Sequence, residues 1–462
     1  MLKKIYHFLH TITFPLENNH SISQPKDQFQ VKSSKILTIN LLSILFMGIT
    51  GLAMNSLILI IYDVNHLGVF NQTLSIYIII SQIASMGIHF SILKETAAID
   101  NSIGNFEKNS INIISAIIAT SLSASLTAII LFLIAPAISN LFQSPNLQNS
   151  LKIAALSLFF YALNKTLINV INGKNLMLEY GKLQLLRYAS LLFFFLILTY
   201  IKINPDYLFL SFLFTELILL FTSIFILKNY QYLNFTFTNL IEIKSSIRKH
   251  LGFGLKGFSS GLLIELNSRV GILSLGIFCS DSVVGKYSLC SFFIEGTTQV
   301  YTLLRNFNAP KLAQMLHEKS YLQIKAFFKI YAIKQRFFSF FFSLSIILLF
   351  ILYGHLYLSS KDFIFKELFI TLTILLFGQI INSPFYAFDN IFILTGLPGQ
   401  HSIFLTISCG LNFLFNLFFI PFFQSIETPE IYAASIGTSI SIIISIIIYK
   451  YTVNNKLGLN LN

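Results

Sequence analysis

Apolar runs of roughly 18 to 25 residues recur along the whole chain, and they constrain its fold more than any other feature. A run of this length can cross the hydrocarbon core of a bilayer as an α-helix. Only 11% of the residues are charged, compared with about 25% in a typical soluble domain, so polar surface is too scarce to cover these helices in water. The predicted fold class is therefore an all-α integral membrane protein.

About twelve membrane helices are predicted, in two sets of six. They cover residues 36–62, 69–92, 111–139, 151–172, 184–201 and 207–227, and then 252–279, 284–308, 337–357, 368–395, 401–423 and 431–449. The predicted organisation is a cytoplasmic leader at 1–35, an N-terminal bundle at 36–227, a cytoplasmic linker at 228–250, a C-terminal bundle at 251–450 and a tail at 451–462. An even number of helices per half predicts two parallel repeats around a central cavity.

The distribution of lysine and arginine predicts the orientation. With the amino terminus inside, about 22 cations lie on cytoplasmic segments and about 5 at outer ends, and cationic loops are retained in the cytoplasm during insertion. Arg187 is counted among the cytoplasmic cations. Both termini are therefore expected in the cytoplasm. This topology also accounts for the net charge of +12, because no single basic face that suits nucleic acid is formed.

Three local patterns add detail to this topology. Residues 311–329 alternate lysines with apolar side chains, which predicts an interfacial helix on the cytoplasmic surface. Leu67-Gly68-Val69-Phe70 and Val284-Gly285-Lys286-Tyr287 each follow a short outer loop with an aspartate, which indicates an internal repeat. Residues 252–257 match GxGxxG without a preceding strand, so we expect close helix packing through Gly257 and Gly261 instead of nucleotide binding.

Four cations inside the predicted spans are candidate substrate-binding residues. A charge near the bilayer centre costs at least about 2.5 to 3.5 kcal/mol, so each needs a reason to be there. Arg269, Lys165, Lys256 and Arg305 are predicted to line a cationic cavity that holds phosphate oxygens. An alternative for Arg269 is simple neutralisation by Glu265, which lies four residues earlier on the same helix face.

Four acidic residues inside the spans are candidates for ion coupling: Glu265, Glu295, Asp389 and Glu216. Carboxylates in dry sites can titrate near neutrality, although each of these is equally well explained as a structural partner of a nearby cation. His89 is interpreted as a packing residue. No hydrolase, transferase or ATP-binding motif occurs and the three cysteines lack metal-site spacing, so no catalytic residue, metal or cofactor is expected.

Several short motifs resemble the polysaccharide flippase branch of the multidrug/oligosaccharidyl-lipid/polysaccharide (MOP) exporter superfamily. They are residues 67–70, 85–89, 94–95, 172–174, 251–255, 268–269 and 284–287, with Pro310. The resemblance covers nearly the whole chain. It identifies Arg269 with the basic residue that this branch often has on its seventh helix, although Val270 stands where an aspartate often follows.

The resemblance implies a non-enzymatic flippase in the bacterial inner membrane that exports undecaprenyl-pyrophosphate-linked O-antigen or capsule repeat units. It also implies membrane lipid, a glycan polymerase and a chain-length regulator as partners. A cation-coupled drug antiporter of the same superfamily fits less well, because the first span has no acid before Asp63. A membrane glycan polymerase or ligase is disfavoured, because no outer loop exceeds about a dozen residues.

Overall fold

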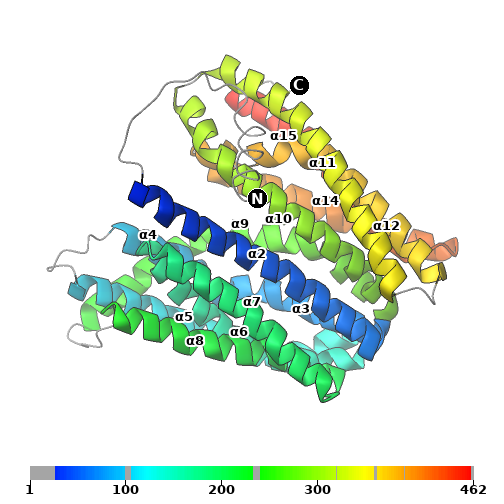
Figure 1. Ribbon diagram of the computed structural model, residues 1–462, viewed down its shortest axis with the longest axis horizontal. Coiled ribbons are helices and arrows are strands. Elements are labelled where there is room, and N and C mark those ends of the chain that lie inside the picture. Colours follow the sequence, from blue (N-terminus) through cyan, green and yellow to red (C-terminus); the bar gives the residue numbers. More distant parts are fainter. Residues whose placement is uncertain are drawn as a thin grey trace. The chain divides into compact units, whose positions relative to one another are not determined.

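The computed structural model describes residues 27–98, 106–232, 240–318, 320–357, 362–389 and 391–458 (Figure 1). Nearly all of these residues are helical, and no β-strand occurs among them. Eleven of the described helices are long and apolar enough to cross a membrane. The predicted all-α membrane fold is confirmed, and helices are expected in lipid because they satisfy their backbone hydrogen bonds internally. The first 26 residues of the predicted leader lie outside the described part.

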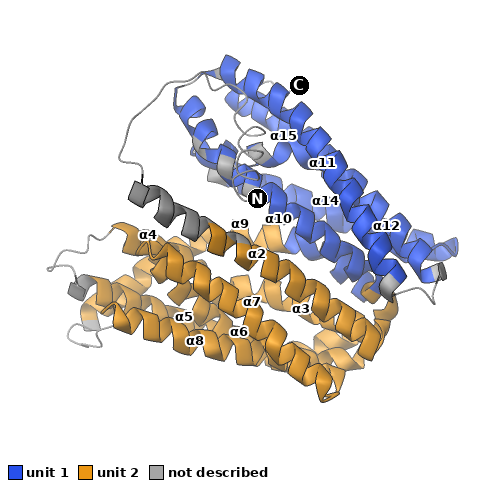
Figure 2. Ribbon diagram, viewed as in Figure 1, with its two compact units in different colours: residues 1–23, 266–279, 286–462 blue, residues 24–265, 280–285 orange. Residues whose placement is uncertain are grey.

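The chain forms two compact units (Figure 2). The N-terminal unit contains the described residues of 24–265 and 280–285, and the C-terminal unit contains those of 266–279 and 286–462. Helix α9 (Leu240–Phe278) contributes to both, because its residues up to Glu265 belong to the N-terminal unit. The linker predicted at 228–250 includes the first turns of α9, and its residues 233–239 lie outside the described part.

The N-terminal unit is organised around two central helices. Its elements before α9 are α2 (Asp27–Ile61), α3 (Val64–Ser85), α4 (Ile88–Ala98), α5 (Phe106–Leu141), α6 (Pro145–Gly173), α7 (Met177–Tyr200), η2 (Pro205–Tyr207) and α8 (Leu210–Asn229). In α3 and α6, 67% of the most apolar stretch is buried, against 28% in the more apolar α5. The most apolar helices are thus the most exposed, as expected where lipid is the solvent.

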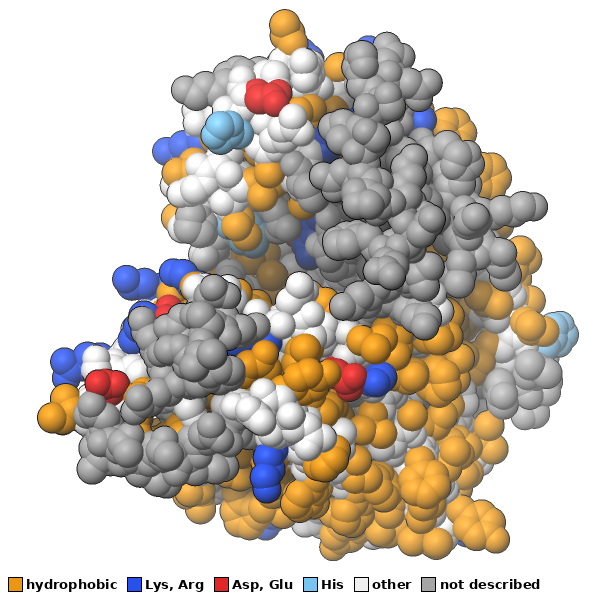
Figure 3. Space-filling model, turned by 60° about the vertical axis from the view of Figure 1, so that its left-hand side comes forward, with side chains coloured by type: hydrophobic (Ala, Val, Ile, Leu, Met, Phe, Trp, Pro, Cys, Tyr) orange, Lys and Arg blue, Asp and Glu red, His pale blue; other side chains and the backbone are white. Residues whose placement is uncertain are grey.

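The outer surface of the N-terminal unit is apolar. Leu126 and Leu133 on α5 and Phe221 on α8 are all more than half exposed. Figure 3 shows hydrophobic side chains gathered over the lower right of the view, with few charged groups between them. A patch of this size on a water-soluble protein would be an aggregation site, so this surface is suited to acyl chains.

The C-terminal unit contains a helix that is broken within the predicted membrane span 368–395. Its elements after α9 are α10 (Asp281–His317), α11 (Tyr321–Tyr357), α12 (Asp362–Asn382), η3 (Ser383–Phe388), α13 (Ile391–Leu394), α14 (Pro398–Ser425) and α15 (Glu430–Leu457). The predicted span 284–308 lies within α10, which is not among the eleven sufficiently apolar helices. The span predicted at 368–395 is divided between α12, η3 and α13.

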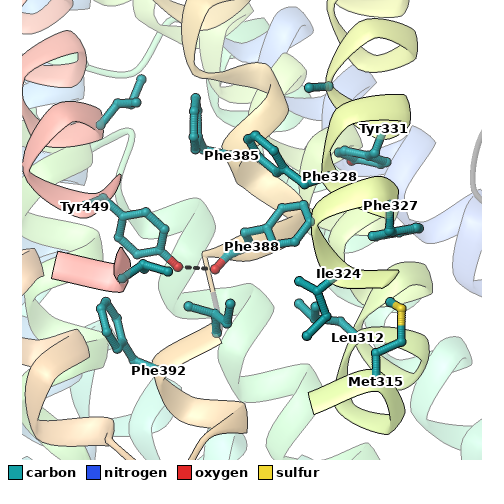
Figure 4. Close-up of a cluster of buried hydrophobic side chains, with 14 residues drawn as sticks. Leu312, Met315, Ile324, Phe327, Phe328, Tyr331, Phe385, Phe388, Phe392 and Tyr449 are labelled. Carbon is teal, nitrogen blue, oxygen red and sulfur yellow. Dashed lines mark hydrogen bonds between the residues drawn. The ribbon is translucent and has the colours of Figure 1, made fainter. Parts of the chain in front are cut away.

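The interfacial helix predicted at 311–329 is wrong. Helices α10 and α11 continue through this region and meet in a short turn around Ser320. The apolar side chains Leu312, Ile324 and Phe327 pack instead into a buried cluster with Phe388 (Figure 4). The pattern was amphipathic because one face of each helix end is buried against protein, and a sequence pattern does not distinguish that face from a lipid-facing one.

Close helix packing at the glycine-rich sequence occurs through Gly254 and not through Gly257. Gly254 contacts the backbone of Met86 and Gly87, at the turn between α3 and α4, so closely that a side chain would collide with it. Gly87 adopts a φ of 69°, which favours glycine. Gly257 has open space where a side chain would begin, and Gly261 meets only the side chain of Gln82. The prediction of a small-residue face at Gly257 and Gly261 is therefore corrected.

The glycines of the two repeat motifs lie close together inside the N-terminal unit. The backbone of Gly68 contacts that of Asp281, and Gly285 contacts the backbone of Val64 and Gly68, again with no room for a side chain. The two preceding aspartates act differently. Asp63 caps its own helix α3 by accepting a hydrogen bond from the His66 amide at 2.8 Å. Asp281 instead reaches across to neighbouring helices.

Asp281 fastens the start of α10 to the N-terminal unit. One carboxylate oxygen accepts a hydrogen bond from Gln72 Nε2 on α3 at 3.0 Å, and the other accepts one from Ser144 Oγ, just before α6, at 2.8 Å. Burial raises the pKa of the Asp281 carboxyl, and the two hydrogen bonds oppose that rise. Because the pKa is raised, the stability that this group contributes falls as the pH rises above about 4.

We predict that Asp281→Ala lowers the free energy of unfolding by about 1.5 to 3 kcal/mol, since it removes two hydrogen bonds to a charged group. Asp281→Asn keeps one acceptor and removes the titration, so it should recover part of that stability and be less sensitive to pH. Thermal unfolding of the detergent-solubilised protein between pH 4 and 8 measures both effects. Equal midpoints for the wild type and the alanine variant would contradict the fastening role.

Candidate functional site

Lys165 is the central cation of a polar site in the N-terminal unit. It lies on α6, and its Nζ donates a hydrogen bond to Gln82 Oε1 on α3 at 2.8 Å. Glu265 on α9 and His89 on α4 interact with it electrostatically. Four helices thus contribute to one group of polar side chains. A neutral amide is the hydrogen-bond partner of the ammonium, so an incoming phosphate oxygen would not have to displace a carboxylate from that bond.

His89 is buried beside this lysine, with only 4% of its surface exposed. Its ring packs against that of Phe90, with ring centroids 4.0 Å apart. Within the part of the chain that the structure describes, Nδ1 has no hydrogen-bond partner. A buried polar atom without a partner is costly, so this nitrogen is available to a ligand or a water molecule. The interpretation of His89 as a packing residue is therefore incomplete.

Glu216, a predicted ion-coupling residue, is held by Arg187. Arg187 Nε lies 3.2 Å from Glu216 Oε1, and Asn164 Nδ2 donates to Glu216 Oε2 at 2.8 Å. The side chains of Arg187 and Glu216 are 15% and 3% exposed, so this is a buried ion pair. The Arg187 guanidinium also lies over the Tyr161 ring, 5.3 Å from its centroid. Each charge is neutralised within the bundle.

The prediction that Arg187 belongs to a cytoplasmic segment is wrong. Helix α7 begins at Met177, before the expected start at residue 184, so Arg187 lies almost three turns inside the helix. The short turn at Lys174 and Asn175 and the acidic Glu179 in the first helical turn were signals for the earlier start. Arg187 is the main intramembrane charge that the sequence interpretation missed in this unit.

Arg269 is neutralised by Glu295 in the C-terminal unit. Its Nη1 lies 2.7 Å from Glu295 Oε1 and its Nη2 donates to Oε2 at 2.9 Å, a two-point contact between α9 and α10. The arginine side chain is 10% exposed, whereas the glutamate is 34% exposed. Arg269, a candidate substrate-binding cation, and Glu295, a candidate coupling acid, thus form one ion pair. Glu295 is its more exposed member.

A group of amide side chains from α14 contacts α9 at Asn267, two residues before Arg269. Asn412 Nδ2 on α14 donates to the Asn267 carbonyl at 3.2 Å, and Asn416 Nδ2 donates to Asn412 Oδ1 at 2.9 Å. Thr438 Oγ1 on α15 donates to the same Asn412 oxygen at 3.2 Å. Such amides and hydroxyls offer both donors and acceptors, which is the chemistry that sugar hydroxyl groups require.

Arg305 and Asp389 form the second ion pair of the C-terminal unit. Arg305 Nη1 on α10 donates to Asp389 Oδ2, which follows η3 directly, at 2.8 Å. The remaining predicted cation, Lys256, lies on α9 in the N-terminal unit and is exposed. Two of the four predicted substrate-binding cations therefore lie in each unit. Both arginines are held by carboxylates that were predicted to carry ions.

The comparisons with known proteins identify the family. A family model described as polysaccharide biosynthesis protein matches residues 103–362, which is more than half of the chain. The chain belongs to the polysaccharide biosynthesis protein family. No curated protein matches this family member in sequence.

Solved structures show which fold the family member has. The inward closed lipid II flippase MurJ superimposes with a TM-score of 0.70 at 15% identity, covering 90% of this chain and 87% of that one. A mutant of the Vibrio cholerae MATE transporter VcmN gives a TM-score of 0.61 at 16% identity, with 92% and 97% covered. A MOP superfamily transporter from Pyrococcus furiosus gives 0.56 at 14% identity, with 91% and 95% covered. This polysaccharide biosynthesis protein thus has the MOP transporter fold, as the resemblance implied.

We predict that the Arg187–Glu216 pair is structural. Arg187→Ala should lower the free energy of unfolding by about 3 to 5 kcal/mol, because it leaves Glu216 charged and buried without its partner. The double variant Arg187→Met/Glu216→Leu should recover much of this loss, since neither charge remains. Thermal unfolding in detergent compares the three proteins.

Lys182→Ala is the matched control for this experiment. Lys182 lies on the same helix, is 53% exposed and pairs with Glu179 at 2.8 Å, and exposed pairs contribute at most about 1 kcal/mol. If Arg187→Ala were no more destabilising than Lys182→Ala, the structural role of Arg187 would be wrong.

Proposed function

We propose that this protein is a flippase of the polysaccharide flippase branch. It exports undecaprenyl-pyrophosphate-linked oligosaccharide repeat units, of O-antigen or capsule, from the cytoplasmic to the outer leaflet by alternating access. The observation that carries the proposal is the Arg269–Glu295 pair. A buried arginine held at two points by one partly exposed carboxylate is a site where a phosphate group can replace the carboxylate with the same geometry.

The physical task of such a flippase is to shelter a charged headgroup while the polyprenyl chain stays in lipid. A diphosphate in hydrocarbon carries a prohibitive desolvation cost unless cations and hydrogen-bond donors accompany it. In the C-terminal unit, Arg269 and Arg305 supply cations, and Asn267 and Asn412 supply groups that suit a glycan. In the N-terminal unit, Lys165 supplies a cation. The polysaccharide biosynthesis family supports a glycan substrate, and the fold that the chain shares with the lipid II flippase MurJ supports a lipid-linked one.

Energy for the outward movement is available from the membrane potential. An inside-negative potential favours the outward movement of an anion by about 2.3 kcal/mol per charge per 100 mV. Two phosphate charges would gain roughly 4 to 5 kcal/mol, provided that the cations of the protein stay in place. In this proposal the protein lies in the bacterial inner membrane with both termini in the cytoplasm, and it works beside a glycan polymerase and a chain-length regulator.

We predict that Arg269→Ala abolishes repeat-unit export in cells. Loss of charge-assisted hydrogen bonds should weaken headgroup binding about tenfold to hundredfold. The experiment deletes the gene in the host bacterium and complements it with the wild type, Arg269→Ala or Arg269→Lys. Surface glycan and the lipid-linked repeat units retained inside the cell are then measured. We expect the alanine variant to resemble the deletion, and the lysine variant to export partially because it keeps the charge without the two-point geometry.

Lys182→Ala, at an exposed position of the N-terminal unit, serves as the control for expression and export. Normal surface glycan with Arg269→Ala at wild-type expression would refute the assigned role of Arg269. If the deletion changed drug susceptibility while surface glycan and lipid-linked intermediates stayed normal, the protein would be a small-molecule antiporter instead.

A further inference from the structure

The break between α12 and α14 lies in the C-terminal unit. In the N-terminal unit the corresponding connection, from α6 to α7, consists of residues 174–176, whereas here it covers residues 383–397. Pro384 accounts for the end of α12, because proline lacks an amide hydrogen and clashes with the preceding helical turn. Backbone that is not helical is tolerated at membrane depth only where protein buries it or water reaches it.

The apolar side of this break is firmly packed. The ring of Phe388 packs against Phe327, Phe328 and Tyr331 of α11 (Figure 4). Tyr449 on α15 donates a hydrogen bond to the carbonyl oxygen of Phe388. This hydrogen bond satisfies one of the carbonyl groups that the interrupted helix leaves free. The residue after Phe388 is therefore held at a defined place in the unit. That residue is Asp389.

Asp389 has a charged partner on one side and an unsatisfied histidine on the other. Its Oδ2 accepts the hydrogen bond from Arg305 Nη1 at 2.8 Å, while its Oδ1 lies 3.9 Å from Nε2 of His401, in the first turn of α14. His401 is only 2% exposed. Neither of its ring nitrogens has a hydrogen-bond partner among the described residues. A histidine buried in this way lacks the hydrogen bonds that normally offset its desolvation.

We propose that His401 and Asp389 form a proton-binding site that controls whether Arg305 is available to the substrate. Histidine is the side chain whose charge ordinarily changes between pH 5 and 8. A proton taken from water onto Nε2 would let His401 donate to Asp389, once the two atoms approach from 3.9 Å to about 2.7 to 2.9 Å. No covalent bond other than the one to the proton is made or broken, and the proton returns to water when the site reopens.

Proton binding changes the charge balance of the site. With neutral His401, the charges of Asp389 and Arg305 cancel. With protonated His401, one carboxylate is shared between two cations, so Arg305 is held less strongly and the site carries one net positive charge. That state favours an anionic phosphate group, and by linkage a bound phosphate favours the proton. The inference rests on the proposed function, because it makes the headgroup of the lipid-linked glycan the anion that the proton helps to bind.

The other groups around the site are mainly tyrosines. Besides Arg305 and His401, the described residues that interact electrostatically with Asp389 include Tyr386 in η3 and Tyr449 on α15. Tyr301 on α10 stacks on Tyr386, and Tyr331 on α11 stacks on Phe327 behind them. Phenols ordinarily remain neutral below about pH 10. Lys450 lies over the Phe385 ring, 5.2 Å from its centroid. The N-terminal end of α14 disfavours a cation at His401, so Asp389 is needed to stabilise it.

The test uses the full-length protein in proteoliposomes that contain an undecaprenyl-pyrophosphate-linked oligosaccharide. Flipping is measured with and without an imposed pH gradient at fixed membrane potential. Because a bound proton favours a bound anion, we expect a gradient that is acidic on the side of substrate uptake to raise the wild-type flipping rate about tenfold. This is a typical coupling between two sites. The flipping rates of His401→Gln and Asp389→Asn should not respond to the gradient. His355→Gln, at an exposed position on α11, should keep the response.

Four outcomes of this experiment support or overturn the proton site. Loss of stimulation in both site variants, with stimulation kept in His355→Gln, supports the proton site. Wild-type stimulation in His401→Gln overturns it, and so does wild-type flipping that ignores the gradient, although the proposed function then stands. Absence of flipping under every condition overturns the proposed function and this inference with it.

A second measurement separates the proton site from a folding defect in His401→Gln. Thermal unfolding of the solubilised variants between pH 5 and 8 should show a smaller pH dependence for His401→Gln than for the wild type and His355→Gln. Identical pH dependence in all three proteins would overturn the site even if the variant transports poorly.

Discussion

A charged side chain inside a membrane helix needs a partner, because hydrocarbon supplies neither counter-charge nor hydrogen bonds. Three arginines in the described part of the chain meet this requirement with a carboxylate from a neighbouring helix: Arg187, Arg269 and Arg305. The pairs differ in accessibility. Arg187–Glu216 is buried on both sides, whereas Glu295 and Asp389 each keep about a third of their surface exposed. The first pair suits a structural role, and the exposed carboxylates of the other two are the basis of the substrate role proposed for their arginines.

Helix α10 carries one member of each partly exposed pair. Glu295 and Arg305 lie on this helix, together with amide and hydroxyl groups, and this polar content explains why α10 is not among the eleven sufficiently apolar helices. Its first residues belong to the N-terminal unit, where Asp281 fastens them, and the remainder belongs to the C-terminal unit. Helix α9 likewise begins in the N-terminal unit and ends in the C-terminal unit. The two helices that carry Arg269, Glu295 and Arg305 thus belong to both units.

The membrane helices could be predicted from the sequence because a run of about twenty apolar residues is visible in the sequence itself, whatever contacts the helix makes in the fold. It could not predict the pairing of charges. The four-residue spacing of Glu265 and Arg269 suggested a pair within one helix, but Arg269 contacts Glu295 of another helix. His401 was placed at the first position of a predicted span, where it would be at the membrane surface. The break after α12 brings it close to Asp389, and only the fold reveals that approach.

The most direct test of the account is equilibrium binding of lipid-linked glycan to the purified protein in nanodiscs. It compares an oligosaccharide carried on undecaprenyl pyrophosphate with the same oligosaccharide on an uncharged polyprenol, for the wild type and for Arg269→Ala. If buried arginines that exchange carboxylate for phosphate recognise the headgroup, the wild type should prefer the diphosphate by about tenfold or more, and the variant should lose that preference. Equal affinity of the wild type for the charged and uncharged lipids would contradict the account.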